Sequence, residues 1–239
     1  MFSVGAVFGK SIEIFSKNFL AILALALILS LPIPIYSLLL TSATDISDLM
    51  RKSFILVAIT LVVNQFVTAA IIYGVVQELR GRRVSAGDAL QRGIQLFFPM
   101  IGVALLVGLI IVVGMIALVI PGLIAITVLW VAIPAAVVER PGVTESLRRS
   151  SALTRGHRWG IFGLILIMGV IGGLSGYLLQ KIVSPTPFAG GSMQTFYILD
   201  YVRSSIVTAF QAVLVAVGYY YLRVEKEGVD IEKIAEAFD

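Results

Sequence analysis

Side chains capable of acid–base or metal chemistry are scarce in this sequence. The chain of 239 residues has no cysteine and one histidine, His157, which stands at a predicted membrane boundary. A thiolate metal site is therefore excluded, and a serine–histidine–aspartate triad would depend on this single residue. Glu78 and Glu139 each end a long apolar segment, and pairing with arginines of the following basic segment is the favoured interpretation of both. We expect no enzyme activity, no cofactor and no metal site.

Polar residues are also few inside the long apolar segments. Asn64 and Gln65 fall in the second segment and Gln211 in the sixth, and no ionisable residue lies near the middle of any segment. Transport proteins usually carry ionisable groups inside the membrane. The three amides are open to interpretation as a shared polar site, but we favour hydrogen bonding between helices, worth about 1 kcal/mol per contact. Asp200 and Arg203, three residues apart, predict a local ion pair rather than a gate.

Glycines at four-residue spacing mark the fifth apolar segment. The pairs are Gly169 with Gly173 and Gly172 with Gly176. Small residues at this spacing let two helix backbones approach closely. Tight packing within one subunit is the favoured interpretation, and a dimer face or a lipid groove is the alternative.

A short amphipathic basic segment occurs three times, and two long apolar segments follow each copy. The three copies are residues 3–17, 85–98 and 143–155. Ungapped alignment places Lys10, Arg92 and Arg149 in one column. Apolar burial together with attraction to anionic headgroups holds such helices in the membrane interface. We therefore predict three interfacial helices, with these headgroup candidates: Arg92, Arg148, Arg149, Arg155 and Arg158.

The apolar segments predict an all-α, polytopic membrane protein with six transmembrane helices. Only 13% of the residues are charged, about half the share of a soluble domain. A span needs about 20 apolar residues, and no clearly broken helix is expected within one. The predicted spans are residues 19–40, 54–79, 100–119, 123–138, 161–182 and 197–222. The third and fourth are joined by a reversal at Ile120-Pro121-Gly122.

Lysine and arginine positions predict the orientation of this single membrane domain, residues 1–239. Placing the N-terminus in the cytoplasm leaves fourteen of the 18 basic residues inside, so both termini should be cytoplasmic and the membrane the cell membrane. The same distribution explains the pI near 9.4 without nucleic-acid binding, because no soluble basic face remains. The repeat units comprise about residues 1–80, 84–139 and 142–223, followed by a cytoplasmic tail, residues 224–239.

Residues 119–168 carry a recognisable pattern. An apolar Ile-Pro-Gly turn leads into a helix that ends Pro-x-x-x-x-Glu, and a Ser-Leu-x-x-Ser segment with a small basic turn follows. The matching residues are Pro121, Gly122, Pro134, Glu139, Ser146, Leu147, Ser150 and Gly156. The pattern resembles membrane proteins grouped with the glycerophosphodiester phosphodiesterase membrane domain, and it is similar to related small integral membrane proteins of unknown function. The resemblance implies a six-helix membrane module without phosphodiesterase activity, which in such proteins belongs to a separate soluble domain.

These observations favour a non-enzymatic function. We expect an integral membrane scaffold or accessory protein that engages anionic lipids and a membrane-protein partner or a second copy of itself. The alternative is a transporter or lipid-handling channel formed between the repeats, because internal repeats are common in transporters. A continuous polar or lipid-wide cavity between the repeats would favour this alternative.

Overall fold

The computed structural model describes residues 2–42, 44–79, 86–183 and 193–228, and these parts of the chain are helical without strands. Six stretches of the described residues are long and apolar enough to cross a membrane, which confirms the predicted all-α, multi-pass fold. The helices are α1 Val4–Lys17, α2 Phe19–Ser30, α3 Pro32–Ser37, the 3-10 helix η1 Leu38–Ser42, α4 Ile46–Leu79, α5 Ala86–Ala117, α6 Val119–Val128, α7 Ala132–Glu139, α8 Val143–Thr154, α9 Arg158–Val183 and α10 Met193–Glu227.

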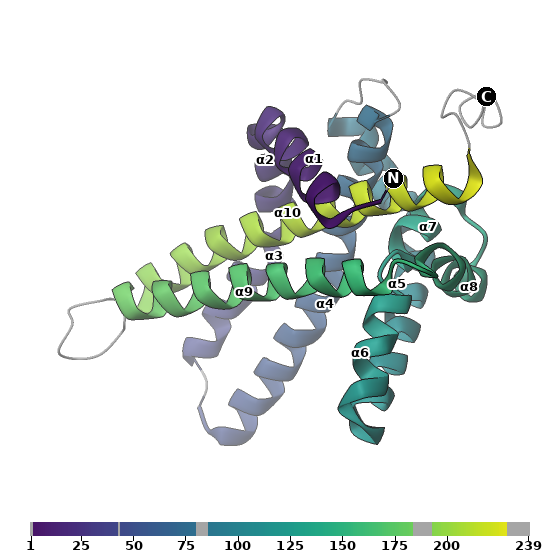
Figure 1. Cartoon of the computed structure of the whole chain (residues 1–239). Helices are drawn as coiled ribbons and strands as arrows, with labels where there is room; N and C mark the ends of the chain where they lie inside the picture. The colour runs from purple at the N-terminus through teal and green to yellow at the C-terminus, as the bar shows by residue number, and fades with distance from the viewer. Residues whose placement is uncertain (1, 43, 80–85, 184–192, 229–239) are drawn as a thin grey trace.

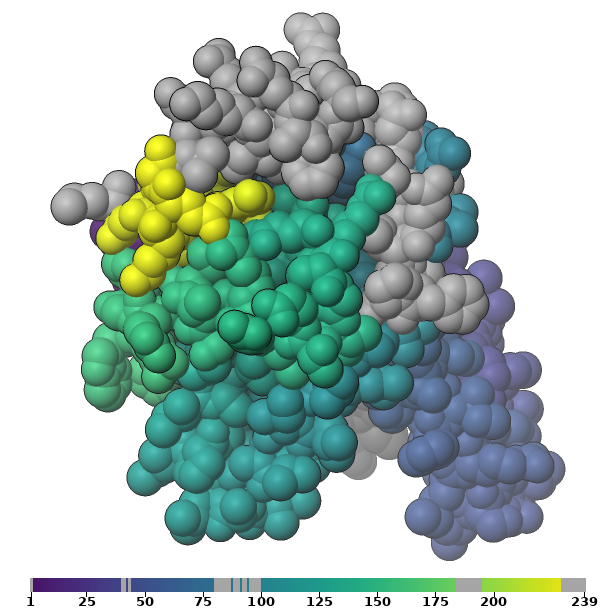
Figure 2. Space-filling model, turned by 90° about the vertical axis from the view of Figure 1, so that its right-hand side faces the viewer, coloured from purple at the N-terminus to yellow at the C-terminus, as the bar shows by residue number. Residues whose placement is uncertain are grey.

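The helices converge at one end of the molecule and diverge at the other. In Figure 1, α9 and α10 run across the view, while α4 and the α5–α6 hairpin run down it. We call the region where α1, α8 and the C-terminal ends of α7 and α10 gather the basic end, because Lys10, Lys17, Arg149 and Arg223 lie there. The turns α3–α4 and α5–α6 form the opposite, hairpin end. Figure 2 shows the α5–α6 hairpin and the start of α4 as separate projections with a hollow between them.

The core lies around α10, which packs against α1, α2, α4 and α9. Its buried apolar residues, among them Val213 and Val217, meet Val7 of α1 and Ile72 of α4. In the most apolar window of α10, 61% of the residues are buried, against 11% in α5. The sixth span is therefore the centre of the bundle, and the third presents most of its apolar surface to the surroundings.

Two sequence predictions about α5 are wrong. Residues 85–98 do not form a separate surface helix, because α5 runs without interruption from Ala86 to Ala117. The reversal to α6 occurs at Leu118, whose φ of −167° is extended, and not at Pro121 and Gly122, which lie inside α6. Gly122 instead permits close packing of the hairpin, since a Cβ there would lie 2.5 Å from Cγ of Met115.

Two of the six spans are broken, contrary to expectation. The first span changes from α2 to α3 at Leu31, and the fourth changes from α6 to α7 over residues 129–131. Prolines account for both, because a proline has no N–H to donate to the carbonyl four residues earlier. Pro32 and Pro34 leave Ile28 and Ser30 without that donor, and Pro134 does the same to Trp130.

Candidate functional site

The break in the fourth span is filled by α8. The Ser150 hydroxyl donates to the carbonyl of Val128 at 2.8 Å and accepts from the N–H of Val131 at 3.2 Å. The Thr154 hydroxyl donates to the same carbonyl at 3.2 Å. Ser146, Ser150 and Thr154 recur at four-residue spacing and are all fully buried. The face of α8 that carries these three hydroxyls therefore lies against the protein.

A network of charged side chains joins α7, α8 and α10 at the basic end. Nε of Arg149 lies 2.7 Å from Oε2 of Glu139, and its guanidinium also contacts Glu227. The Tyr219 hydroxyl donates to Oε1 of Glu139 at 2.5 Å, and Nε of Arg223 donates to Oε2 of Glu227 at 2.9 Å. The positive charges of two arginines and the negative charges of two glutamates thus balance one another. Burial lowers the pKa of Arg149, but hydrogen bonds to Glu227 and Glu139 hold it above its ordinary value.

This network shows that Arg149, one of the predicted headgroup candidates, is paired within the chain. It also confirms the predicted pairing of Glu139 with an arginine of the following basic segment. Arg149 is engaged by two carboxylates of its own chain and is three-quarters shielded from solvent, so it is not a free cation. Glu78 also has partners, and those within the described residues lie at the C-terminal end of α1 and at its cap. Nδ2 of Asn18 donates to Oε2 of Glu78 at 2.7 Å, and Lys17 lies at 3.5 Å from Oε1.

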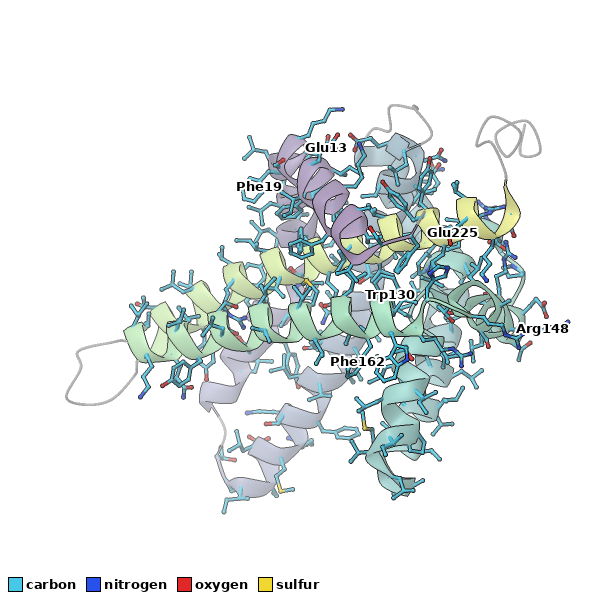
Figure 3. The ribbon with its side chains drawn as sticks, viewed as in Figure 1. Glu13, Phe19, Trp130, Arg148, Phe162 and Glu225 are labelled. Atoms are coloured by element: carbon cyan, nitrogen blue, oxygen red, sulfur yellow. The ribbon has the colours of Figure 1, made fainter. Side chains whose placement is uncertain are left out.

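The remaining described headgroup candidates are exposed. Arg155 and Arg158 are open to the surroundings, and the side chain of Arg148 is 82% exposed, with Glu145 at 3.8 Å. In Figure 3, Arg148 points outward from α8, whereas Trp130 lies among the helices. Trp159, next to Arg158, is 86% exposed. The side chain of Arg92 lies outside the part of the chain that the structure describes.

His157 links the start of α9 to the end of α10. Its Nε2 lies 3.2 Å from Oε1 of Glu225, and its ring lies 5.1 Å from that of Phe2. The backbone N–H of Phe2 donates to the same glutamate. His157 therefore sits in a structural contact between the first and last described helices, without a carboxylate–nucleophile arrangement around it in the described residues.

The glycines of α9 divide into two faces. A Cβ on Gly172 would lie 3.8 Å from Val207 and one on Gly176 would lie 3.7 Å from Arg203, so these two pack against α10. The positions of Gly169 and Gly173 have no atom within 4 Å.

Arg203, which packs over Gly176, forms the predicted ion pair with Asp200 at 2.6 Å. Its guanidinium also reaches the hydroxyl of Ser175 at 3.3 Å. The pair therefore braces α10 against α9.

Within the part of the chain that the structure describes, the three amides form no hydrogen bond between helices, contrary to the prediction. Gln211 is exposed on the outer surface of α10, and Oε1 of Gln65 is buried without a partner among the described residues. Asn64 lines a cavity between α2–α3, α4 and α10.

That cavity lies at the break of the first span and has a volume of about 440 Å³. The cavity is partly open, and ten of its fifteen lining residues are polar, although the helices around it are long and apolar enough to span a membrane. The Tyr201 hydroxyl donates to the carbonyl of Leu27, which has lost its regular partner because the N–H of Leu31 turns to Ile28. The cavity therefore joins the first and third sequence units through a broken helix, a feature that the apolar pattern did not reveal.

Comparison with known proteins gives a family but no function. A family model described as Domain of unknown function (DUF7847) matches residues 96–224, more than half of the chain. The matched region contains the break in the fourth span, α8 and most of the charged network. No curated protein and no solved structure matches the chain.

Proposed function

The chain belongs to this family of unknown function, and from its own residues we propose that it is an accessory or scaffold protein. In this proposal it engages anionic lipids at the basic end. The observation that carries the proposal is the cluster of Arg148, Arg155, Arg158 and Trp159, which is exposed while neighbouring charges are paired within the chain. The likeness to the glycerophosphodiester phosphodiesterase membrane domain remains a prediction consistent with a non-enzymatic module.

The physical basis is attraction to the headgroups of one leaflet. Each lysine or arginine near an anionic surface contributes about 1 kcal/mol, and tryptophan favours the same depth of the membrane. The three arginines together therefore contribute about 3 kcal/mol. On this basis the basic end faces the cytoplasmic leaflet of the cell membrane, with both termini in the cytoplasm.

The proposed partner is another membrane helix, from a different protein or from a second copy of this chain. Gly169 and Gly173 support this part of the proposal, because the space beside them is open and glycine permits close backbone approach. Such contact would let the protein organise a neighbour while its arginines hold the local lipids.

The test compares lipid retention in two sets of variants. Arg148→Gln, Arg155→Gln and Arg158→Gln are combined in one protein. Arg51→Gln with Lys181→Gln, at exposed residues near the start of α4 and the end of α9, form the control. Native mass spectrometry from nanodiscs of mixed phosphatidylglycerol and phosphatidylcholine reads the bound lipid. We expect the triple variant to lose most of its bound phosphatidylglycerol and the control to keep it. Unchanged retention in the triple variant would contradict the proposal.

The cavity and the two broken spans favour a second candidate, a transporter or lipid-handling channel. Discontinuous helices form the binding sites of many transporters. Because the chain has no cysteine, Asn64→Cys places one reactive thiol in the cavity. Labelling by membrane-impermeant maleimides from both sides of reconstituted vesicles supports a passage, and labelling from one side alone rules out a continuous path in that state.

A further inference from the structure

We propose that the cavity at the break of the first span binds a small neutral polyhydroxy group, such as a polyol or a monosaccharide. The group is either a free solute or the headgroup of a lipid. The cavity lies on α2–α3, α4 and α10, and none of the exposed arginines of the basic end lines it. This proposal therefore stands independently of the proposed binding of anionic lipids.

The walls of the cavity are rich in hydroxyl groups. Eight of the lining residues are serines, threonines or tyrosines, joined by one amide, Asn64, and one carboxylate, Asp200. A hydroxyl both donates and accepts hydrogen bonds. Such a surface matches a ligand that carries donors and acceptors on neighbouring atoms, as polyols and sugars do.

Some of these hydroxyls are used to hold the helices together. Tyr201 bonds to the carbonyl of Leu27, and the Ser30 and Ser205 hydroxyls lie 3.3 Å apart across the α2–α10 contact. Ser205 also donates to the carbonyl of Tyr201 at 2.8 Å. These contacts keep the two walls in place without occupying the space between them.

Other polar groups on the cavity are free to meet a ligand. Thr60 and Asn64 on α4 and Thr208 on α10 make no hydrogen bond to a protein group within the part of the chain that the structure describes. Polar groups removed from bulk water carry a substantial cost when they stay unpaired. They come from two different helices that line one space, so a polar molecule bound there has unpaired protein groups from both helices beside it.

Charge on the cavity wall favours a neutral ligand. Among the described residues, no lysine or arginine lines the space, so an anionic group such as a phosphate would find no counter-charge from them. The Asp200 carboxylate is already paired with Arg203 at 2.6 Å, and Arg203 also reaches Ser175 on α9. A paired carboxylate still accepts hydrogen bonds from ligand hydroxyls, but its attraction for a free cation is reduced.

The size of the cavity agrees with this class of ligand. The volume of about 440 Å³ lies within the range of small-molecule sites, about 300 to 1,000 Å³. A bare metal ion or a single water would leave most of that space unfilled, whereas a polyol or a monosaccharide with its own hydration shell fits.

The experiment measures binding of sorbitol and glucose to the full chain in nanodiscs of neutral lipid, by isothermal titration calorimetry and by ligand-induced change in Tm. Asn64→Leu and Thr208→Val remove polar groups that make no protein hydrogen bond, so folding should be retained. Gln211→Leu removes an exposed amide from α10 and is the matched control. We expect one of the two compounds to bind, each cavity variant to weaken binding about tenfold, and the control to leave it unchanged.

A second arm separates the two sources of the ligand. Nanodiscs containing a monoglucosyl diacylglycerol are compared with nanodiscs containing plain diacylglycerol, with native mass spectrometry as the readout. Binding of the free compound alone assigns a solute, and selective retention of the glycolipid assigns a headgroup. Absence of both, tighter binding of glucose 6-phosphate than of glucose, or equal binding by the wild type and both cavity variants would overturn the proposal. Combining Arg148→Gln, Arg155→Gln and Arg158→Gln should leave sugar binding unchanged, which separates this test from that of the proposed function.

Discussion

The first and fourth spans are both interrupted, but the backbone groups at the two breaks have different partners. In the fourth span, Ser150 of α8 bonds to the carbonyl of Val128 and the N–H of Val131, and Thr154 bonds to the same carbonyl; Val131 at the break is fully buried. In the first span, Tyr201 supplies one hydroxyl to the carbonyl of Leu27, and the rest of the break borders a polar cavity.

The contrast separates a structural joint from a candidate binding site. Inside a membrane, every backbone polar group needs a partner, whether from the protein, water or a ligand. Where a dedicated helix supplies the partners, as α8 does, nothing is left for another molecule. Where the partners are few and polar side chains border a space, as around Asn64, the break remains able to bind.

The largest effect is expected from Ser150→Ala. This change removes a donor and an acceptor at once and leaves the N–H of Val131 unpaired in a buried position. We expect the free energy of unfolding, measured by SDS titration in bicelles, to fall by about 3 kcal/mol. Ser151→Ala, at a half-buried neighbouring serine of α8, is the control and should change stability little. Equal effects of the two changes would show that α8 does not support the break.

Gly218→Ala tests how closely the fourth-span break packs on α10. A Cβ at Gly218 would overlap the ring of Trp130, so the ring must move. We expect a loss of about 2 kcal/mol in the same measurement, and partial recovery when Trp130→Phe is added. Gly108→Ala, at a position with no atom within 4 Å, is the comparison and should be neutral or slightly stabilising. Additive effects of Gly218→Ala and Trp130→Phe would contradict this contact.

Arg149→Met tests the charged network that holds α8 in place. Glu139 and Glu227 would keep Arg223, which lies 3.9 Å from Oε1 of Glu139 and 2.9 Å from Oε2 of Glu227. Because these side chains are about one-fifth exposed, we expect a loss of about 1.5 kcal/mol, less than for a fully buried pair. Arg148→Met, at the exposed neighbouring arginine, should have no measurable effect on stability.

The smallest effect is expected from Tyr201→Phe in the first span. The change removes the hydrogen bond to the carbonyl of Leu27, but the Ser30 hydroxyl, 3.5 Å from the same carbonyl oxygen, remains as a donor. We expect a loss of about 0.5 to 1 kcal/mol by SDS titration. Tyr177→Phe, at an exposed tyrosine of α9, serves as the control. A loss for Tyr201→Phe that matches Ser150→Ala would remove the contrast between the two breaks.

The fold class and most of the spans were predictable because long apolar segments leave few alternatives to membrane helices. The breaks also had a local signal, since Pro32, Pro34 and Pro134 lie inside predicted spans. The four-residue spacing of Ser146, Ser150 and Thr154 was visible too. The sequence did not show whether that face contacts lipid headgroups or a helix break, because a polar face suits both environments equally.

The contacts of the candidate sites could not be predicted because they depend on partners far along the chain. Arg149 meets Glu227, 78 residues away, and Ser30 meets Ser205, 175 residues away. The cavity lies between α2–α3, α4 and α10, and hydropathy carries no information on how these helices are placed relative to one another. For the same reason, the amides Asn64 and Gln211 could not be sorted into one that lines the cavity and one that is exposed.

The divergence of the α5–α6 hairpin from α4 gives the molecule unequal cross-sections at its two ends (Figure 2). If the two ends lie at opposite faces of a bilayer, such a wedge would displace different numbers of lipids from the two leaflets. A bilayer that holds the protein in this way would then respond to the shape of its lipids as well as to the charge of their headgroups.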